Sequence, residues 1–338
     1  MVGKNSIAFP YGVGVAGVGK YLPDAKITNE DLEASAGVKA EDILQKTGIV
    51  TRCKAADDEV MSDMAVKAAK EAINSASIDP LEIGLIITCT FTGDYVYPAV
   101  SCRIQERLGA VNAGVFDLMA NCTGFQVGLG VASDRMLIDP KIKYAIVIGA
   151  ALQTRFIDPS DADSSIYFGD GVGAAVLEQV PAGYGIISND VLANGKAFDA
   201  VRLRGGGSSF PMRADNVGEG LQYYDIVGLE VWKQVVTFQP KNIRLALKEA
   251  NLKLKDIDFF IFHQANGNLI KFLMSRLELP MSKTHLTVNR FGNTADASIG
   301  ITLDEALRKK KIKKNDIILL SGVGAGFIFG TSILKWAY

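Results

Sequence analysis

Short apolar runs alternate with longer amphipathic stretches along the chain, and this alternation predicts a layered α/β fold. Continuous apolar runs such as Leu85-Ile86-Ile87 predict strands that are buried on both faces. The predicted strands cover residues 85–90, 115–118, 144–148, 173–177, 259–262, 317–320 and 331–334. The predicted helices cover residues 62–76, 124–136 and 240–250, together with a stretch that starts at residue 228.

A unit of helix, short polar link and buried strand occurs twice. Lys70-Glu71-Ala72 leads into strand 85–90, and Lys248-Glu249-Ala250 leads into strand 259–262. Chance similarity is one interpretation of this weak repeat. The other is two similar halves, residues 1–178 and 179–338, whose strands end near a shared cleft. Residues 183–220 are less regular and rich in glycine, so we expect a surface connection between the halves.

Composition narrows the functional classes. The net charge of −1 over 338 residues gives no general attraction to nucleic acid or to an anionic membrane. No apolar run reaches the roughly 18 residues of a spanning helix, and the first residues lack a signal-peptide layout. The four cysteines form no CxxC pair, and we expect no metal site. We therefore expect a cytoplasmic protein in which an unpaired cysteine can serve in catalysis.

Cys122 is the first candidate for that role. It follows the apolar run 115–120 and precedes an apolar stretch with small residues at helical spacing, which places it where a strand passes into a helix. The free amides and partial positive charge of a helix start favour a thiolate, so we predict a nucleophile. Taken alone, Cys122 could equally be a buried structural cysteine.

His263 and Asn293 suggest a reaction for this nucleophile. His263 ends the strand 259–262, and Asn293 lies in a Gly-Asn-Thr turn sequence. Each is more simply structural when taken alone. A cysteine, a histidine and an asparagine together occur in papain-type proteases and in enzymes that condense acyl thioesters. The protease signature around the cysteine is absent.

Six short motifs are distributed over most of the chain. They are Thr47-Gly48-Ile49, Asn121-Cys122-Thr123-Gly124-Phe125, residues 168–177, His263-Gln264-Ala265-Asn266, Gly292-Asn293-Thr294-Ala295 and residues 322–327. In this order they resemble the β-ketoacyl-acyl-carrier-protein synthase III family of the thiolase-like superfamily. The resemblance implies a five-layer αβαβα fold of two duplicated halves, and a homodimer.

The resemblance also implies catalytic roles. Cys122 would take the acyl group from a thioester of coenzyme A or acyl carrier protein. His263 and Asn293 would stabilise the enolate formed by decarboxylation of a malonyl-type thioester on acyl carrier protein. The backbone amides of Cys122 and Ala325 would form the oxyanion hole. Because loss of CO2 drives the condensation, no metal or redox cofactor is implied.

Further positions are implied for substrate and partner. Tyr97, contributed by the partner subunit, Val323 and Phe327 would line the acyl pocket. The carrier protein is acidic and would dock on Lys233, Lys271 and Arg276.

The chain departs from the family where coenzyme A is usually bound. A tryptophan and two arginines of relatives correspond to Asp42, Lys46 and Ala162. Aspartates near a pyrophosphate would repel it. We therefore expect the acyl donor to be presented differently from acetyl-CoA, for example on a carrier protein.

Two other functions compete with condensation. One is an acyltransferase of the same fold that moves an acyl group to a small acceptor without condensation. The other is a non-catalytic scaffold that binds carrier protein. Retention of Cys122, His263 and Asn293 disfavours both. The pathway, fatty acid or specialised polyketide synthesis, stays open.

Overall fold

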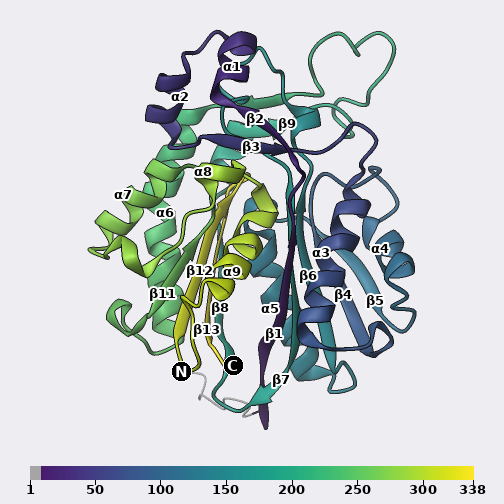
Figure 1. The fold of residues 1–338 in the computed structure, drawn as a ribbon, viewed down its shortest axis with the longest axis vertical. Coiled ribbons are helices and arrows are strands. Elements are labelled where there is room, and N and C mark those ends of the chain that lie inside the picture. The colour runs from purple at the N-terminus through teal and green to yellow at the C-terminus, as the bar shows by residue number, and fades with distance from the viewer. Residues whose placement is uncertain (1–8) are drawn as a thin grey trace.

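Two mixed β-sheets face each other across two central helices (Figure 1). The computed structural model describes residues 9–338. The central helices are α5 (Gly124–Ile138) and α9 (Ser298–Arg308), and each packs against strands of both sheets. Helices on the outer faces complete five layers, as the predicted αβαβα architecture requires.

The first sheet has the strand order β1-β7-β6-β4-β5. Its strands are β1 (Tyr11–Tyr21), β7 (Gly171–Pro181), β6 (Tyr144–Ala151), β4 (Ile83–Cys89) and β5 (Gly114–Leu118). β4 runs parallel to β5 and β6, whereas β7 is antiparallel to both β6 and β1. The central strands are buried on both faces, which explains their continuous apolar sequences.

The second sheet repeats this pattern. Its order is β11-β12-β13-β8, formed by β11 (Phe259–Phe262), β12 (Ile317–Gly324), β13 (Ile328–Lys335) and β8 (Gly185–Ala193). From β11 onward the pairings are parallel, antiparallel and antiparallel, as they are from β4 onward in the first sheet. This shared succession supports a duplication. The chain passes between the sheets after Pro181, so the boundary expected after residue 178 falls inside β7.

Helices cover the outer face of each sheet (Figure 1). α3 (Met61–Ala76) and α4 (Val100–Leu108) cover the first sheet. α6 (Gly228–Glu249) and α7 (Gly267–Arg276) cover the second. α6 is a single helix that contains Pro240, where the sequence indicated two separate stretches. Within residues 9–338, no helix is both long and apolar enough to cross a membrane.

Smaller elements close one end of the molecule, at the top of Figure 1. These are β2 (Ala25–Thr28), α1 (Asn29–Ala36), α2 (Ala40–Thr47), β3 (Thr51–Lys54), β9 (Val201–Leu203) and β10 (Tyr224–Ile226). The buried Arg52 guanidinium donates to Asn29 Oδ1 and to the carbonyl of Ile166. These bonds hold the end cap against the segment that precedes β7.

Most predicted strands are confirmed, but the prediction of an irregular connection over residues 183–220 is partly wrong. β8 lies within it and forms the edge of the second sheet. Residues 11–21 form the long strand β1, which the apolar pattern did not predict. Both strands are interrupted by small or polar residues, so neither has the apolar run typical of a buried strand.

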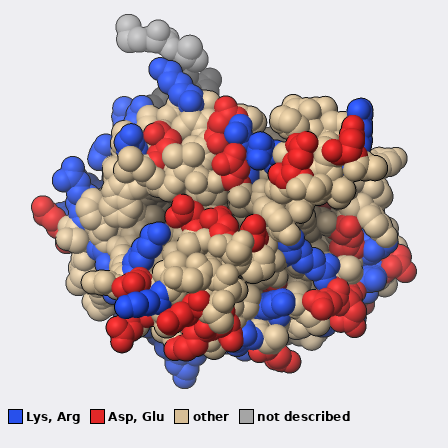
Figure 2. Space-filling view, turned by 90° about the horizontal axis from the view of Figure 1, so that it is seen from above, with Lys and Arg blue, Asp and Glu red and all other residues tan. Residues whose placement is uncertain are grey.

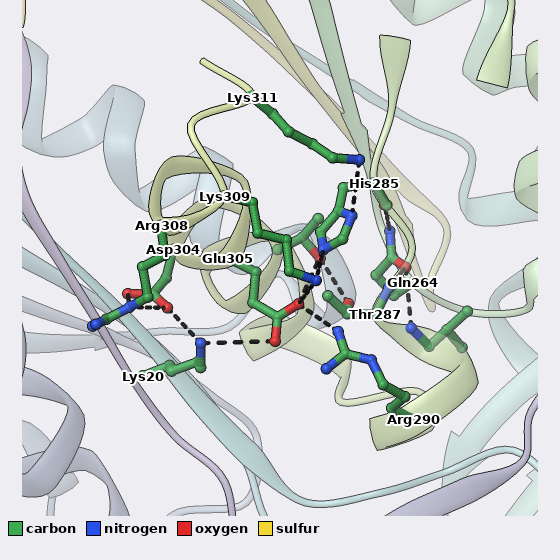
Figure 3. Close-up of polar contacts among 12 residues, drawn as sticks. Lys20, Gln264, His285, Thr287, Arg290, Asp304, Glu305, Arg308, Lys309 and Lys311 are labelled. Atoms are coloured by element: carbon green, nitrogen blue, oxygen red, sulfur yellow. Dashed lines mark hydrogen bonds and ion pairs between the residues drawn. The ribbon is translucent and has the colours of Figure 1, made fainter. Parts of the chain in front are cut away.

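A charge network joins α9 to its surroundings (Figure 3). The Glu305 carboxylate is 8% exposed and lies 3.0 Å from His285 Nε2. It also contacts the guanidinium of Arg290, a residue of α8 (Val288–Phe291). Lys20 of β1 lies 2.6 Å from Asp304 and 3.8 Å from Glu305. Burial alone would raise the pKa of Glu305, but the bonds from His285 and Arg290 and the charges of Arg290 and Lys20 hold it well below its ordinary value.

We expect Glu305→Gln to lower the free energy of unfolding by about 1–3 kcal/mol near pH 7, because buried donors lose a charged acceptor. A depressed pKa gives its full stabilisation above the unfolded pKa, about 4.3 for glutamate, and this stabilisation is lost as the pH falls towards the folded pKa. The difference between native and variant protein should therefore shrink as the pH falls below about 4. Urea unfolding over this pH range measures it. Glu71→Gln, which removes a more exposed partner of Arg308, is the matched control. An equal loss at all pH values would contradict the assignment.

Candidate active site

Cys122 lies where the sequence predicted, between a strand and a buried helix. After β5 the chain forms a single 3₁₀ turn, η2 (Asn121–Thr123), and then α5. The Thr123 hydroxyl donates to the carbonyl of Ala120 at 2.7 Å and holds this turn. Asn121 has a φ of 49°, a left-handed value that costs a residue other than glycine roughly 1 kcal/mol. The half-buried Cys122 thus stands at a strained corner at the start of α5.

The loop between β12 and β13 packs directly on this corner. A Cβ on Gly324 would lie 2.6 Å from the Ala120 carbonyl oxygen and 3.1 Å from the Cys122 nitrogen, so only glycine permits the contact. Asn121 Nδ2 donates to the carbonyl of Ala325 at 3.0 Å. The structure therefore brings together Cys122 and Ala325, the two residues whose amides were expected to bind an oxyanion.

His263 follows β11 and is 6% exposed. Its Nδ1 lies 2.7 Å from the Ser298 hydroxyl at the start of α9, and that hydroxyl also accepts the Gln264 amide at 3.3 Å. The Ser298 hydroxyl can donate its hydrogen to Nδ1 while it accepts this amide, and in that tautomer Nε2 carries the N–H. Burial lowers the pKa of His263 to about 3, so the ring is neutral near pH 7.

Asn293 is clamped through its backbone. Its backbone N–H donates to the Tyr167 carbonyl at 2.8 Å. Its carbonyl accepts from the Gly169 amide at 3.0 Å and from Gln153 Nε2 at 2.8 Å. Its Oδ1 accepts the Ala295 amide at 2.9 Å. Since Oδ1 is engaged, Nδ2 is the group of this side chain that is available to donate to a substrate.

The three predicted catalytic residues converge. Gly322 lies between two of them, because a Cβ there would be 3.3 Å from both the Cys122 carbonyl oxygen and His263 Cβ. Asn293 precedes the 3₁₀ turn η7 (Ala295–Ala297), which packs against η2. The site thus contains a thiol and two neutral donors on separate elements.

The protonation state of Cys122 depends on burial as well as on the helix start. Burial raises the pKa of the thiol far above its ordinary value, and the nearby Asp296 carboxyl raises it further. The amide of Cys122 itself opposes this shift without reversing it. Burial therefore opposes the thiolate that the helix start was predicted to favour.

Sequence reasoning missed four residues of the site: Gln153, Tyr224, Asp296 and Ser298. Gln153 donates to the Asn293 carbonyl and accepts from the Tyr224 hydroxyl at 3.2 Å. Tyr224 belongs to β10, and its ring packs against Phe168 at 5.0 Å. No local pattern identified Gln153 or Tyr224. Asp296 and Ser298 offered a signal, since they are polar residues among the small residues after Asn293.

The three altered coenzyme A positions lie near one another. Asp42 and Lys46 are exposed on α2, and Lys46 Nζ lies 3.7 Å from Asp163, next to Ala162. The one cation among these positions is thus already paired with an acid. The positive charge offered to a phosphate here is correspondingly small.

The predicted pocket and docking residues separate into groups. Val323 and Phe327 are buried around the β12–β13 loop, whereas Tyr97 is 86% exposed. Lys233 and Lys271 are exposed on α6 and α7. They lie next in sequence to Trp232 and Phe272, whose rings contact each other at 5.2 Å.

Arg276, the third predicted docking residue, is the last residue of α7. It lines a groove with Leu277, which follows α7, and with Arg244 of α6.

Known proteins match nearly the whole chain. Residues 116–195 match the family model described as 3-oxoacyl-[acyl-carrier-protein] synthase III, and residues 247–336 match its C-terminal model. Beta-ketoacyl-[acyl-carrier-protein] synthase III of Clostridioides difficile (strain 630) is 38% identical over 323 residues, covering 96% of this chain and 98% of that protein.

Solved structures agree. The crystal structure of 3-oxoacyl-[acyl-carrier-protein] synthase III from Aquifex aeolicus VF5 has a TM-score of 0.87 and 33% identity, covering 96% of this chain and 100% of that chain. The priming β-ketosynthase from the R1128 polyketide biosynthetic pathway has a TM-score of 0.89 and 29% identity, covering 99% of both chains. The thiolase-like α/β fold is thereby confirmed, and the chain belongs to the 3-oxoacyl-[acyl-carrier-protein] synthase III family.

Proposed function

We propose that this protein loads an acyl group on Cys122 and extends it by decarboxylative Claisen condensation with a malonyl-type thioester on acyl carrier protein. The observation that carries this proposal is the hydrogen bond between His263 Nδ1 and Ser298. It turns a neutral imidazole into an Nε2–H donor beside the Asn293 amide and the Cys122 thiol. Retention of both donors does not favour the acyltransferase without condensation.

In the first half-reaction, the Cys122 sulfur attacks the carbonyl carbon of the donor thioester. The oxyanion that develops is stabilised by the amides of Cys122 and Ala325, where each such donor contributes roughly 10²–10³ in rate. The tetrahedral intermediate collapses, the donor thiol leaves and acyl-Cys122 remains.

In the second half-reaction, the thioester carbonyl of the malonyl unit accepts hydrogen bonds from His263 Nε2 and Asn293 Nδ2. Cleavage of the carboxyl C–C bond releases CO2 and leaves an enolate, whose oxygen keeps the same two donors. The enolate carbon attacks the acyl-Cys122 carbonyl, the new C–C bond forms and Cys122 leaves as a thiolate. Loss of CO2 makes this step favourable, so the proposal needs no metal or redox cofactor.

The donor is proposed to arrive on a carrier protein instead of as acyl-CoA. Lys46 is already paired with Asp163, and the exposed Asp42 adds negative charge to the same surface. Figure 2 views the molecule from this end and shows acidic and basic side chains interspersed, without one continuous basic field. A coenzyme A pyrophosphate would gain little here.

The start of α6 and the neighbouring α7 form the proposed docking surface. Trp232 and Phe272 are 41% and 38% exposed and make a small apolar centre. Lys233 and Lys271 supply positive charge beside it, although Lys233 Nζ also lies 3.7 Å from Glu230. An apolar centre with a basic rim suits an acidic carrier protein.

A homodimer is the proposed assembly. Tyr95, Val96 and Tyr97 are 62%, 93% and 86% exposed, an apolar run that a second copy would cover. β5 is an edge strand of the first sheet, and Phe116 and Met119 are exposed there. In this dimer Tyr97 would enter the acyl pocket of the partner subunit. The cytoplasmic location stays a prediction.

Replacing His263 by alanine should separate the two half-reactions. We expect condensation to fall by about 10²–10³, because the enolate loses one donor. The acyl adduct on Cys122 should still form, because loading does not use that donor. Intact-protein mass spectrometry reports the adduct, and CO2 release reports condensation. Cys122→Ala is the control and should form no adduct. Loss of the adduct in His263→Ala would contradict the assigned roles.

Donor preference tests the altered coenzyme A surface. We expect Cys122 to be acylated faster from acyl carrier protein than from acyl-CoA with the same acyl group. The double variant Asp42→Trp/Ala162→Arg should lower the KM for acyl-CoA roughly tenfold, the effect of one added charge-assisted contact. Its loading from the carrier protein should be unchanged. Efficient acylation of the native protein at low acetyl-CoA concentration would exclude the proposal.

Charge reversal on α6 and α7 tests docking. Lys233→Glu and Lys271→Glu should each raise the KM for malonyl-carrier protein several-fold, with the difference shrinking at high salt. The KM for malonyl-CoA should not change. Lys70→Glu is the control and should have little effect, since Lys70 is exposed on α3, which covers the other sheet. Equal effects of all three variants would place the carrier protein elsewhere.

A further inference from the structure

Asp296 is a buried acid that the mechanism above does not use. It lies in the turn η7, three residues after Asn293, and is 1% exposed. Among the residues that the structure describes, neither carboxyl oxygen has a hydrogen-bond partner. A buried carboxyl without a partner costs roughly 1–3 kcal/mol of stability, so its presence calls for a function.

The carboxyl reaches the first turn of α5. A Cβ on Gly124 would lie 2.2 Å from Asp296 Oδ1, so the oxygen is in contact with that glycine, two residues after Cys122. The packing of η7 on η2 brings the same two segments together. Asp296 therefore faces the base of the helix that presents the nucleophile.

The titratable groups around Asp296 are acids. Cys122 faces it from η2, Cys89 from β4 and Tyr224 from β10, and each of these three has its pKa raised in part by the Asp296 charge. Asp170, which precedes β7, acts on Tyr224 in the same way. No cation contributes to the pKa of Asp296. Burial raises that pKa well above the ordinary value, and the nearby backbone amides of Asp296 and Gly124, which are outside good hydrogen-bond geometry, oppose this only in part. The carboxyl is thus a stronger base than an exposed aspartate.

His263 is poorly suited to accept the thiol proton. Its Nδ1 is engaged by Ser298, and burial lowers its pKa to about 3. The carboxyl in contact with the start of α5 is that of Asp296.

We propose that the Asp296 carboxyl exchanges a proton with the Cys122 thiol during the catalytic cycle, and this inference rests on the proposed condensing function. In loading, the S–H proton passes to the Asp296 carboxylate as sulfur bonds to the acyl carbon. The departing donor thiolate then takes this proton and leaves as a thiol. The Asp296 carboxylate then takes up one proton from the solvent before condensation. After condensation it gives this proton to the Cys122 thiolate and is again a carboxylate. Charge and protons balance in each half-reaction.

The isosteric change Asp296→Asn tests the exchange with two readouts of opposite sign. Single-turnover acylation of Cys122 by an acyl-carrier-protein donor near pH 7 should slow by about 10²–10⁴, the usual worth of a proton-transfer group. Its pH dependence should lose the contribution of the carboxyl. Alkylation of Cys122 by iodoacetamide should instead shift to lower pH, because a neighbouring negative charge no longer opposes the thiolate.

If the role of Asp296 were only structural, Asp296→Asn would change acylation and alkylation in the same direction. If Asp296 only shaped the turn, Asp296→Asn would slow acylation and alkylation alike and would lower the melting temperature. We expect thermal stability to be kept or increased, since no hydrogen-bond partner is lost. Asp134→Asn, an exposed site farther along α5, is the matched control and should match the native protein.

The outcomes separate this inference from the function on which it rests. Native-like acylation and an unchanged pH profile in Asp296→Asn would overturn the proton exchange while leaving the condensing function intact. Absence of an acyl adduct on native Cys122 with every thioester donor would overturn the function itself. The alkylation profile would still report whether Asp296 and Cys122 are coupled.

Discussion

The close approach of α9 to the first sheet is the constraint on which the site depends. A Cβ on Gly149 of β6 would lie 2.3 Å from the Asp296 carbonyl oxygen, and one on Gly173 of β7 would lie 2.8 Å from Gly300 Cα. Because these positions lack side chains, the start of α9 rests directly on the sheet backbone. Asn293 and Ser298 belong to this start, so the same contact places the second half of the protein beside Cys122 in the first half.

The reacting groups are held without a formal charge near neutral pH. Burial lowers the pKa of His263 and raises that of Cys122, so both favour their neutral forms. Neutral donors suit an enolate that exists only briefly, because a permanent cation would also bind the malonyl carboxylate and oppose its loss. Orientation is supplied by Ser298 and by the backbone clamp on Asn293, instead of by ion pairs. The ion pairs around Glu305 lie farther along α9, where they serve the fold.

Part of the fold and of the site could be predicted from local sequence patterns. Strand 259–262 and the position of Cys122 at a helix start could be predicted, because a buried strand and a helix start each have a local pattern. β1 was not predicted because its glycines interrupt the apolar run. These glycines allow α3 to pack closely on the strand, since a Cβ on Gly17 would lie 2.5 Å from the Ala72 carbonyl oxygen. Tyr224 and Gln153 act on Asn293 across more than 60 residues, a relation that no local pattern records. The burial that opposes a thiolate at Cys122 has no local pattern for a similar reason, since desolvation depends on the whole enclosure.

Proton balance gives the buried acid a physical rationale. A cycle that consumes a thioester and a malonyl unit and releases a thiol, CO2 and a β-keto thioester also consumes one proton. That proton is needed on the sulfur when Cys122 leaves as a thiolate, inside an enclosure where a free anion is costly. Neutral His263 has its Nε2–H directed to the substrate oxygen, and giving that proton up would leave an anionic ring. A carboxyl whose pKa is raised by burial takes up a proton and can pass it to the thiolate without placing a cation beside the decarboxylating group. An unpartnered Asp296 is then the expected compromise between a small loss of stability and a group that can both accept and return the proton of the thiol.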